Sequence, residues 1–389
     1  MTEPIAPFTF DTPPSLVFGF GAAGRIGEIA AARLGSRVLV VTDPGVVAAG
    51  LVEPALAALA GAGVEAAVFP DVVADPPEAV VRAAAAAAVA FEATGVVGLG
   101  GGSSLDVAKL AALLAIGRED LADVYGVRRA KGPRLPLLLA PTTAGTGSEV
   151  TPIAVVTTGA HEKMGVSSPV IIPDVALLDP ELTLGLPPAV TAATGIDAMV
   201  HAIEAYASAS PNNNPISRAL AVEALRLMGG ALERAVADGS DRAARADMLF
   251  GAMLAGQAFA NSPVAAVHAL AYPLGGHYGV PHGLSNALIL PHVLRFNAET
   301  VPGPYATLAP HAFPALAEIG EQGRAHALAD ALAALSARCG LAARLRDVGV
   351  EESALPHLAT DAARQTRLLV NNPRPLGEAD ILAIYRRAW

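Results

Sequence analysis

Two kinds of segment alternate through the first half of the chain: short runs of β-branched residues and longer runs rich in alanine. The β-branched runs have the length and continuous hydrophobicity of buried parallel strands; they span residues 37–43, 64–69, 95–100 and 135–140. The alanine-rich runs are typical of helices; they span residues 51–62 and 77–93. Strands that alternate with helices in this way predict βαβ units and a parallel sheet.

Strand character fades after residues 170–179, and the second half is predicted to be helical throughout. From Pro187 onward, helical runs are separated by glycine, proline and asparagine breaks, and the polar cluster at 208–215 predicts a loop. A chain of 389 residues is long for one core, which favours two domains. We therefore expect an α/β domain over residues 1–187 and an all-helical domain over residues 188–389.

The overall charge limits the binding partners that we expect, and the cysteine count excludes sites built from several thiols. A net charge of −10 and a pI of about 5.4, without a basic stripe, argue against nucleic acid and anionic membranes as partners. The single cysteine, Cys339, excludes an intrachain disulfide and a thiolate metal cluster. The start of the chain has no basic segment followed by an apolar run, and no uninterrupted apolar run reaches about 18 residues. We expect no signal peptide, no membrane span and a cytoplasmic location.

Two glycine-rich stretches compete as the phosphate-binding site of a dinucleotide. The first, Gly19, Gly21 and Gly24, has the spacing G-x-G-x-x-G, and Asp43 follows 19 residues after Gly24 at the end of a predicted strand. This match is weak by itself, because the chain contains 38 glycines.

The second stretch, Gly98 to Asp106, lies between a predicted strand and a helix predicted over 105–116. Glycines let the backbone approach a pyrophosphate closely, and the free amides and positive dipole end of the helix favour the anion. Ser103 and Asp106 also have the spacing of a helix-capping pair, so a capped glycine turn is the alternative. We favour the second stretch as the phosphate site.

A third polar segment, residues 141–150, follows the strand predicted over 135–140. Its glycines make it flexible, and such a loop can close over a ribose or a nicotinamide. Its hydroxyl groups belong to Thr142, Thr143, Thr146 and Ser148. By composition alone, it is only a loop.

The strongest chemical signal is a set of one aspartate and three histidines in the helical half. Asp197 and His201 are four residues apart in a predicted helix and therefore share one face. His268 is expected at a helix end, and His282 follows 14 residues later, after a loop with glycine and proline. Three imidazoles and one carboxylate suit Fe²⁺ or Zn²⁺, whereas Mg²⁺ prefers oxygen ligands. The sequence therefore predicts one divalent ion held by these four residues.

The remaining histidines carry weaker signals. His292 is equally compatible with packing and with function. Four others lie outside any cluster in the sequence and are expected to be structural or surface residues; they are His161, His311, His326 and His357.

Four segments resemble the motifs of the iron-containing (group III) alcohol dehydrogenases. They occur in the family's order and the likeness covers nearly the whole chain; they are residues 100–109, 141–149, 195–206 and 268–291. The resemblance implies a dehydroquinate synthase-like architecture, with a Rossmann-like α/β nucleotide-binding domain followed by an all-α metal-binding domain. It also implies an active site in the cleft between the domains and, as in many members, a homodimer.

The resemblance also assigns cofactor contacts. It places the pyrophosphate at Gly101, Gly102 and Ser103, and it identifies the glycines at 19–24 as the family's opening strand-to-helix turn. Asp43 matches the position that meets the adenosine ribose, where a carboxylate accepts from a 2′-hydroxyl and repels a 2′-phosphate, so NAD is favoured over NADP. The other expected cofactor-binding residues are Asp106, Thr142, Thr143, Thr146, Ser148 and Lys163.

One position departs from the family pattern. Many relatives carry a second histidine four residues after the one that matches His268, and it is thought to help relay the proton; this chain has Tyr272 there. We therefore expect proton transfer through Tyr272, His277 or water. All the expected metal ligands are present, which argues against the metal-independent maleylacetate reductases.

Together these features predict the reversible oxidation of a primary alcohol to an aldehyde. A divalent ion, Fe²⁺ or alternatively Zn²⁺, acts as the Lewis acid, and NAD accepts the hydride. The sequence does not distinguish short alcohols, diols and ω-hydroxy acids as substrates. A polyol dehydrogenase or a hydroxyacid–oxoacid transhydrogenase would use the same residues around a different pocket. A non-catalytic regulator that binds NAD and metal, and a structural metal site, are further alternatives.

Overall fold

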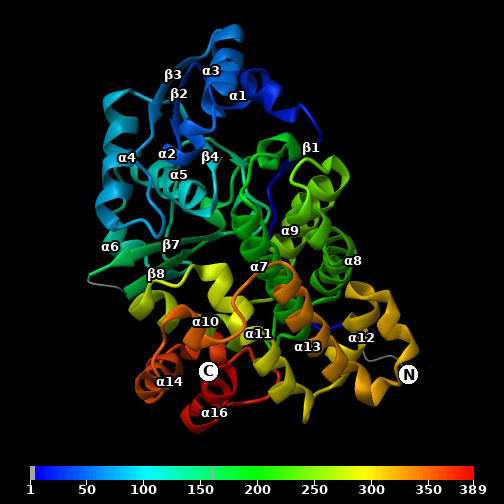
Figure 1. The fold of residues 1–389 in the computed structure, drawn as a ribbon. Helices are drawn as coiled ribbons and strands as arrows, with labels where there is room; N and C mark the ends of the chain where they lie inside the picture. Colours follow the sequence, from blue (N-terminus) through cyan, green and yellow to red (C-terminus); the bar gives the residue numbers. More distant parts are fainter. Residues whose placement is uncertain (1–4, 160–161) are drawn as a thin grey trace. The chain divides into compact units, whose positions relative to one another are not determined.

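The hydrophobic runs of the first half assemble into one parallel sheet, and the helical runs of the second half form a separate unit (Figure 1). The computed structural model describes residues 5–159 and 162–389. The first unit comprises Asp11–Leu186. The second comprises Pro187–Trp389 together with the described residues up to Phe10.

The described residues of the opening segment, up to Phe10, belong to the helical unit and not to the α/β domain in which we placed them, and so does Pro187. The backbone N–H of Thr9 donates to Oδ1 of Asn212, and Nδ2 of Asn212 donates to the carbonyl of Thr9, both at 2.9 Å. These two residues are 203 positions apart. A contact over that distance leaves no local pattern, so the prediction could not include it.

Six parallel strands form the main sheet, in the order β1-β9-β6-β4-β2-β3. Its strands are β1 (Ser15–Phe18), β2 (Arg37–Val41), β3 (Glu65–Phe69), β4 (Gly95–Gly100), β6 (Leu137–Pro141) and β9 (Val175–Leu178). The four β-branched runs of the first half are all among them, so the predicted parallel α/β fold is confirmed.

Alternate residues of the central strands face opposite sides of this sheet, because successive strand side chains point in opposite directions. Val38 and Val40 pack in one hydrophobic core with helices α1 and α3, whereas Leu39 and Val41 pack in the other with α4 and α5. Both faces are therefore covered, as the unbroken hydrophobic runs predicted. These helices are α1 (Ile26–Arg33), α3 (Val52–Gly61), α4 (Glu78–Ala90) and α5 (Gly102–Leu114).

The strand order reverses between β2 and β4. The chain runs from β2 outward to β3 and then returns to β4, which pairs with the other side of β2. Parallel α/β sheets bind ligands outside the carboxyl ends of their strands at such a reversal. Asp43 directly follows β2, and the glycine turn of residues 100–102 follows β4, so both lie at this position.

A second, three-stranded sheet in the same unit was not predicted. Strands β7 (Ile153–Thr158) and β8 (Glu162–Ser167) pair antiparallel, and β5 (Gly126–Val127) adds to β8. The β8 segment, Glu-Lys-Met-Gly-Val-Ser, has no clear hydrophobic alternation. Pairing with β7, rather than intrinsic preference, therefore determines its conformation. Two short helices, α2 (Pro44–Ala48) and α6 (Leu121–Val124), complete the described part of this unit.

The second unit contains helices and no strand among its described residues. Its α-helices are α7 (Pro188–Ala207), α8 (Pro215–Ala237), α9 (Arg242–Asn261), α10 (Ala266–Tyr278), α11 (His282–Ala298), α12 (Gly303–Ala312), α13 (Glu321–Arg338), α14 (Leu355–Ala363), α15 (Thr366–Leu369) and α16 (Glu378–Ala388). None of the described helices combines the length and the hydrophobicity needed to cross a membrane.

Helix α7 is the centre of this unit and packs against α8, α9 and α11. The start of α11 approaches α7 so closely that a Cβ atom on Gly283 would lie 2.3 Å from the carbonyl oxygen of Ala193. Only glycine fits there, and the contact fixes the position of the preceding residue, His282. Cys339 is buried in the same unit, as expected for a small hydrophobic side chain.

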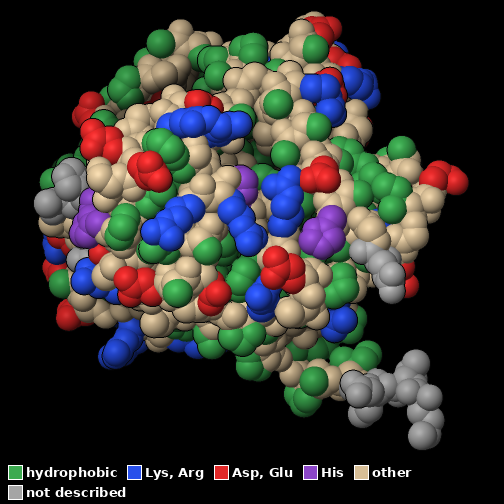
Figure 2. Space-filling model, turned by 60° about the horizontal axis from the view of Figure 1, so that its bottom comes forward, with side chains coloured by type: hydrophobic (Ala, Val, Ile, Leu, Met, Phe, Trp, Pro, Cys, Tyr) green, Lys and Arg blue, Asp and Glu red, His purple; other side chains and the backbone are tan. Residues whose placement is uncertain are grey.

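Charged side chains of both signs are interspersed on the face that Figure 2 shows. This distribution agrees with the acidic net charge and the absence of a basic stripe in the sequence. A one-sign basic surface is the usual electrostatic mark of nucleic-acid binding, and this face does not have it.

Candidate metal and nucleotide sites

The amides of the first glycine motif are already bound by a carboxylate of the chain. After β1, the backbone turns at Gly21 into a short 3-10 helix, Ala22–Arg25. Asp179, which follows the neighbouring strand β9, accepts from the N–H groups of Gly21 at 3.2 Å and Ala23 at 2.9 Å. An anion-binding turn that is filled by its own aspartate is not available to a pyrophosphate. The structure therefore agrees with the interpretation of this motif as an opening turn.

The second glycine motif leaves its helix start uncapped. Helix α5 begins at Gly102, and its N-cap, Gly101, makes no side-chain capping bond. The alternative interpretation, a glycine turn capped by Ser103 and Asp106, is therefore wrong, because Ser103 lies inside the first turn. The first amides of a helix have no acceptor within the helix, so at this position they can receive an anion.

Close packing explains why this turn consists of glycine. Gly100 has a φ of 156°, and a Cβ on Gly102 would lie 2.7 Å from the Thr146 side chain. Thr143 and Thr146 thus lie directly against the turn, as expected for a loop that shares its ligand. Thr142 is buried in the first residues of the same loop.

Asp43 connects β2 to the start of α5 across the strand reversal. Its Oδ1 accepts from the N–H of Val46 at 3.1 Å and caps α2, and its Oδ2 accepts from the hydroxyl of Ser104 at 2.8 Å. The half-buried carboxylate is therefore held in a fixed orientation beside the glycine turn. This is where a carboxylate that recognises a ribose is needed.

Asp106 and Ser148 belong to a buried network rather than to an open surface. The carboxylate of Asp106 accepts from the Ser148 hydroxyl at 2.6 Å and from the N–H of Val155 at 2.9 Å. Lys109, fully buried, donates to Ser148 at 2.9 Å and to the carbonyl of Ile153 at 2.7 Å. Burial lowers the pKa of Lys109 to about 8, although nearby carboxylates oppose the shift. The contacts that these side chains make hold the 141–151 loop against α5.

Lys163 lies on β8, in the three-stranded sheet of this unit. Its ammonium forms an ion pair with the carboxylate of Asp75. This ion pair does not bring Lys163 together with the other expected cofactor residues.

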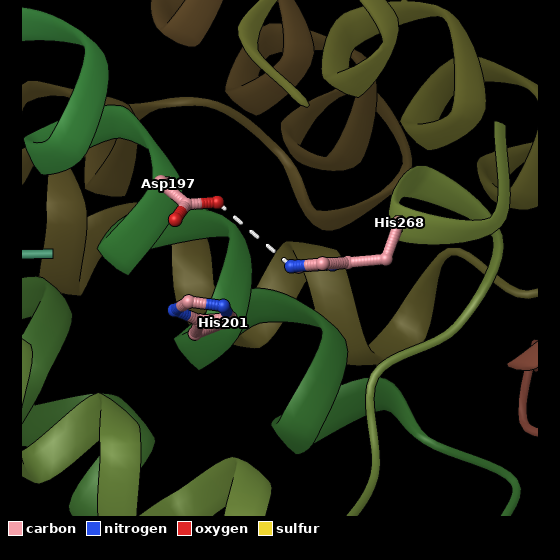
Figure 3. A group of neighbouring side chains, drawn as sticks. All are labelled: Asp197, His201 and His268. Atoms are coloured by element: carbon pink, nitrogen blue, oxygen red, sulfur yellow. Dashed lines mark ion pairs between the residues drawn. The ribbon is translucent and has the colours of Figure 1, made fainter. Parts of the chain in front are cut away.

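In the helical unit, three of the four expected metal ligands converge (Figure 3). Asp197 and His201 project from successive turns of α7, and His268 reaches them from the first turn of α10. One potential ligand atom from each lies within 4.8 Å of the others, and all three side chains are buried. The ring of His201 stacks between Phe259, at 4.3 Å, and His268, at 4.8 Å, measured between ring centroids.

His282 approaches the same group from the first residue of α11. Its Nε2 lies 3.8 Å from Oδ1 of Asp197, and Nε2 of His268 lies at the same distance. These separations are too long for hydrogen bonds. They are close to the roughly 3.4 Å expected between ligands of a tetrahedral ion with bonds of about 2.0–2.1 Å.

The contacts of the Asn286 side chain indicate whether this group of residues could bind a cation. Its Nδ2 donates to Oδ1 of Asp197 at 2.5 Å and lies 3.3 Å from Nε2 of both His268 and His282. A group with partly positive hydrogens thus lies where one carboxylate oxygen and two imidazole nitrogens converge. Meanwhile, the buried Oδ1 of Asn286 has no hydrogen-bond partner among the described residues. Unsatisfied buried groups are rare, and a divalent ion could take the converging lone pairs in place of the amide, which fits the group to a cation.

Glu204 determines which nitrogen of His268 is available. Oε2 of Glu204 lies 2.6 Å from Nδ1 of His268, and Oε1 accepts from the N–H of Val267 at 2.7 Å. A carboxylate at Nδ1 requires a proton on that nitrogen, so the lone pair lies on Nε2, which faces Asp197. A carboxylate that orients a metal-binding imidazole in this way is a common feature of metal sites.

Glu204 and Asn286 were not among the residues predicted from the sequence to have a functional role. Both have a positional signal: Glu204 lies seven residues after Asp197 in α7, and Asn286 lies four after His282 in α11. These spacings place each residue on the same helix face as a ligand. The spacing shows a shared face but not which neighbouring helix that face meets.

The two expected proton-transfer residues lie in different surroundings. Tyr272 is half-buried, and its ring centroid is 6.0 Å from that of His282. His277 instead has its Nε2 at 2.7 Å from Oδ2 of Asp361, close to His357. His357 is exposed, as expected for a surface residue, but the fold places it in one group with His277 and Asp361. His161 lies outside the described residues.

Comparisons with known proteins give one result for both halves of the chain. Residues 13–180 match the family described as iron-containing alcohol dehydrogenase. Residues 191–389 match the C-terminal part of the Fe-containing alcohol dehydrogenase family. Long-chain-alcohol dehydrogenase 1 of Geobacillus thermodenitrificans is 43% identical over 97% of this chain and 95% of its own length.

Comparison with solved structures gives the same family. A 1,3-propanediol oxidoreductase superposes with a TM-score of 0.94 at 37% identity, covering 98% of this chain and all of the other. Sulfoacetaldehyde reductase from Bifidobacterium kashiwanohense, solved in complex with NAD⁺, has a TM-score of 0.87 at 31% identity and covers 98% of both chains. The chain therefore belongs to the iron-containing alcohol dehydrogenase family.

Proposed function

We propose that this chain interconverts a primary alcohol and its aldehyde, using NAD and a divalent metal held by Asp197, His201, His268 and His282. The observation that carries the proposal is the convergence of an aspartate oxygen and two imidazole nitrogens on the amide of Asn286. When bound, the metal supplies Lewis acidity at the substrate oxygen, and the nicotinamide supplies the hydride acceptor. Fe²⁺ is the ion we favour, with Zn²⁺ as the alternative.

The residues around the metal ligands prepare them for this role. Glu204 keeps the proton on Nδ1 of His268 and directs its Nε2 lone pair inward. Asp197 supplies the one carboxylate of the set, so the site carries negative charge toward a cation. Burial of Asp197, His201 and His268 strengthens their interaction with an ion, whereas the side chain of His282 is partly exposed.

We assign proton transfer to Tyr272, directly or through water. Its phenol ring is half-buried and lies beside His282, one of the residues that would hold the metal. His277 is bound to Asp361 instead, so we do not retain it in this role.

In the α/β unit, we propose that the uncapped start of α5 receives the NAD pyrophosphate. The amides of Gly101, Gly102 and Ser103 and the positive dipole end of the helix support this. Asp43 is placed to accept from the adenosine ribose. Asp106 and Ser148 have an indirect role: their hydrogen bond holds the 141–151 loop in place. Thr143 and Thr146 of that loop lie against the glycine turn.

Primary aliphatic alcohols are the substrate class we propose, because relatives are named for long-chain alcohols, 1,3-propanediol and sulfoacetaldehyde. All three names describe a terminal alcohol or aldehyde on an aliphatic chain. We further propose a cytoplasmic location, which rests on the expectation from the sequence.

The reaction is tested by removing the metal and restoring it. We expect NADH oxidation with a panel of aliphatic aldehydes to vanish after chelation and to return with anaerobic Fe²⁺ or Zn²⁺. The panel should span short aldehydes, 3-hydroxypropanal, long-chain aldehydes and ω-oxo acids, which ranks the substrates in the same experiment. Activity that persists without metal would contradict the proposal. Turnover with an oxoacid and no free NAD would instead indicate a transhydrogenase.

The role of Glu204 predicts a change in metal affinity. The variant Glu204→Gln removes the negative charge behind His268, and we expect metal affinity to fall by about 10–100-fold. His268→Ala should reduce it further. Competition with a chelator measures both, and Glu223→Gln, an exposed carboxylate on α8 that pairs with Arg226, is the control. Wild-type affinity in Glu204→Gln would show that the carboxylate only supports packing.

The role of Asp43 predicts a change in coenzyme preference. In Asp43→Gly, the repulsion of a 2′-phosphate is lost, so we expect the ratio of kcat/KM for NADP to that for NAD to rise by at least about tenfold. Asp179→Ala is a matched control, because it removes another helix-start carboxylate of the same unit. That control should lower stability and leave the ratio unchanged. An unchanged ratio in Asp43→Gly would remove Asp43 from the ribose site.

We also propose that the chain forms a homodimer. Strand β1 lies at an edge of the main sheet and exposes the side chains of Leu16 and Phe18. An edge strand with apolar side chains favours pairing with another strand. Light scattering on the purified chain should give twice the monomer mass, and Leu16→Lys should shift the protein toward the monomer. A monomeric wild-type protein would contradict the proposal.

A further inference from the structure

A second group of ligand-type side chains lies in the helical unit, on helices α10 and α14. It consists of His277, His357 and Asp361, which share no residue with the group around Asp197. One ligand atom from each lies within 4.8 Å of the others. The Nε2 atoms of His277 and His357 are 2.7 Å and 3.5 Å from Oδ2 of Asp361.

Two helices, α10 and α14, contribute the three side chains. His357 and Asp361 are four residues apart on α14, so they share one face. His277 comes from the last turn of α10, which packs against α14. The two imidazole rings meet edge to face, with centroids 5.0 Å apart. The three side chains thus point to one place without a rearrangement of the backbone.

The other carboxylate oxygen of Asp361, Oδ1, pairs with an arginine. Nη1 of Arg364 lies 3.0 Å from Oδ1 of Asp361. This bond orients the carboxylate so that Oδ2, and not Oδ1, faces the two imidazoles. Partners that orient a ligand in this way are typical of metal sites.

The chemistry of the group suits a borderline transition ion. Two imidazole nitrogens and one carboxylate oxygen bind Zn²⁺ or Cu²⁺ better than Mg²⁺ or Ca²⁺. The side chains of His277 and His357 are 41% and 67% exposed, so water can fill the other coordination positions. In the hydrogen bond between His277 and Asp361 the hydrogen lies on the line between Nε2 and Oδ2, and a metal ion would take its place between these two atoms.

We propose that His277, His357 and Asp361 form a second divalent metal site, open to solvent, that takes Zn²⁺ or an ion of similar chemistry. His277 lies nine residues after His268 and five before His282, within the segment that connects two proposed ligands of the first metal. An ion bound here links the end of α10 to α14. Occupancy therefore stabilises the segment that presents His268 and His282.

The test measures how many Zn²⁺ ions the full-length protein binds. Protein that is first saturated with Zn²⁺ at the Asp197 site is dialysed against increasing micromolar Zn²⁺, and bound zinc is counted by mass spectrometry. We expect a second equivalent in the wild type, accompanied by a rise in Tm. His357→Ala should lose that equivalent and the rise in Tm while keeping its turnover. His326→Ala, which removes an exposed histidine of α13, should retain both.

A variant of the first site shows whether the two sites bind zinc independently. Asp197→Asn should lose the first equivalent and keep the one that depends on His357, so a failure of the first assignment does not affect the second. The proposal is overturned if the wild type takes up no additional zinc, or if His357→Ala takes up as much as the wild type. A changed pH profile of kcat in His357→Ala would also overturn it, because that would place the group in proton transfer instead.

Discussion

The helical unit depends on the burial of one carboxylate among imidazoles. The ligand-type atoms of Asp197, His201 and His268 lie close together, and all three side chains are buried. Burying such groups without a positive partner is costly. The amide of Asn286 provides only part of that positive charge. The chemistry of the group therefore fits a cation, and the packing of α7, α10 and α11 brings its side chains together.

This packing positions the ligands through contacts between helices rather than through flexible loops. The first turn of α11 can rest on α7 because Gly283 has no side chain, which brings His282 to Asp197. Glu204, two turns along α7 from Asp197, holds the ring of His268 on α10. Ligands held by rigid elements keep their geometry before an ion binds, which reduces the cost of binding it.

In the α/β unit, aspartate side chains cap some helix starts with hydrogen bonds and leave the start of α5 without a side-chain cap. Asp179 fills the first glycine turn, and Asp43 caps α2 while it holds Ser104 at the strand reversal. Asp106 is directed inward to the network around Lys109. The two glycine motifs therefore differ in their hydrogen bonding, because a carboxylate accepts from the amides of the first turn, whereas the start of α5 has no side-chain cap.

The sequence by itself determined the strands, most helices, the parallel α/β unit and the four ligand-type residues around Asp197. The strands and helices follow from hydrophobic period, which acts locally along the chain. The ligand-type residues were recognised from two separate sequence clusters and from the family resemblance. Only the tertiary structure decided that Asp179 fills the first motif, that Glu204 orients His268, and that His277 joins a different group. Each of these contacts joins residues more than 60 positions apart. Helix and strand periods show which face a residue occupies, but the partner of that face is set by the packing of the whole unit.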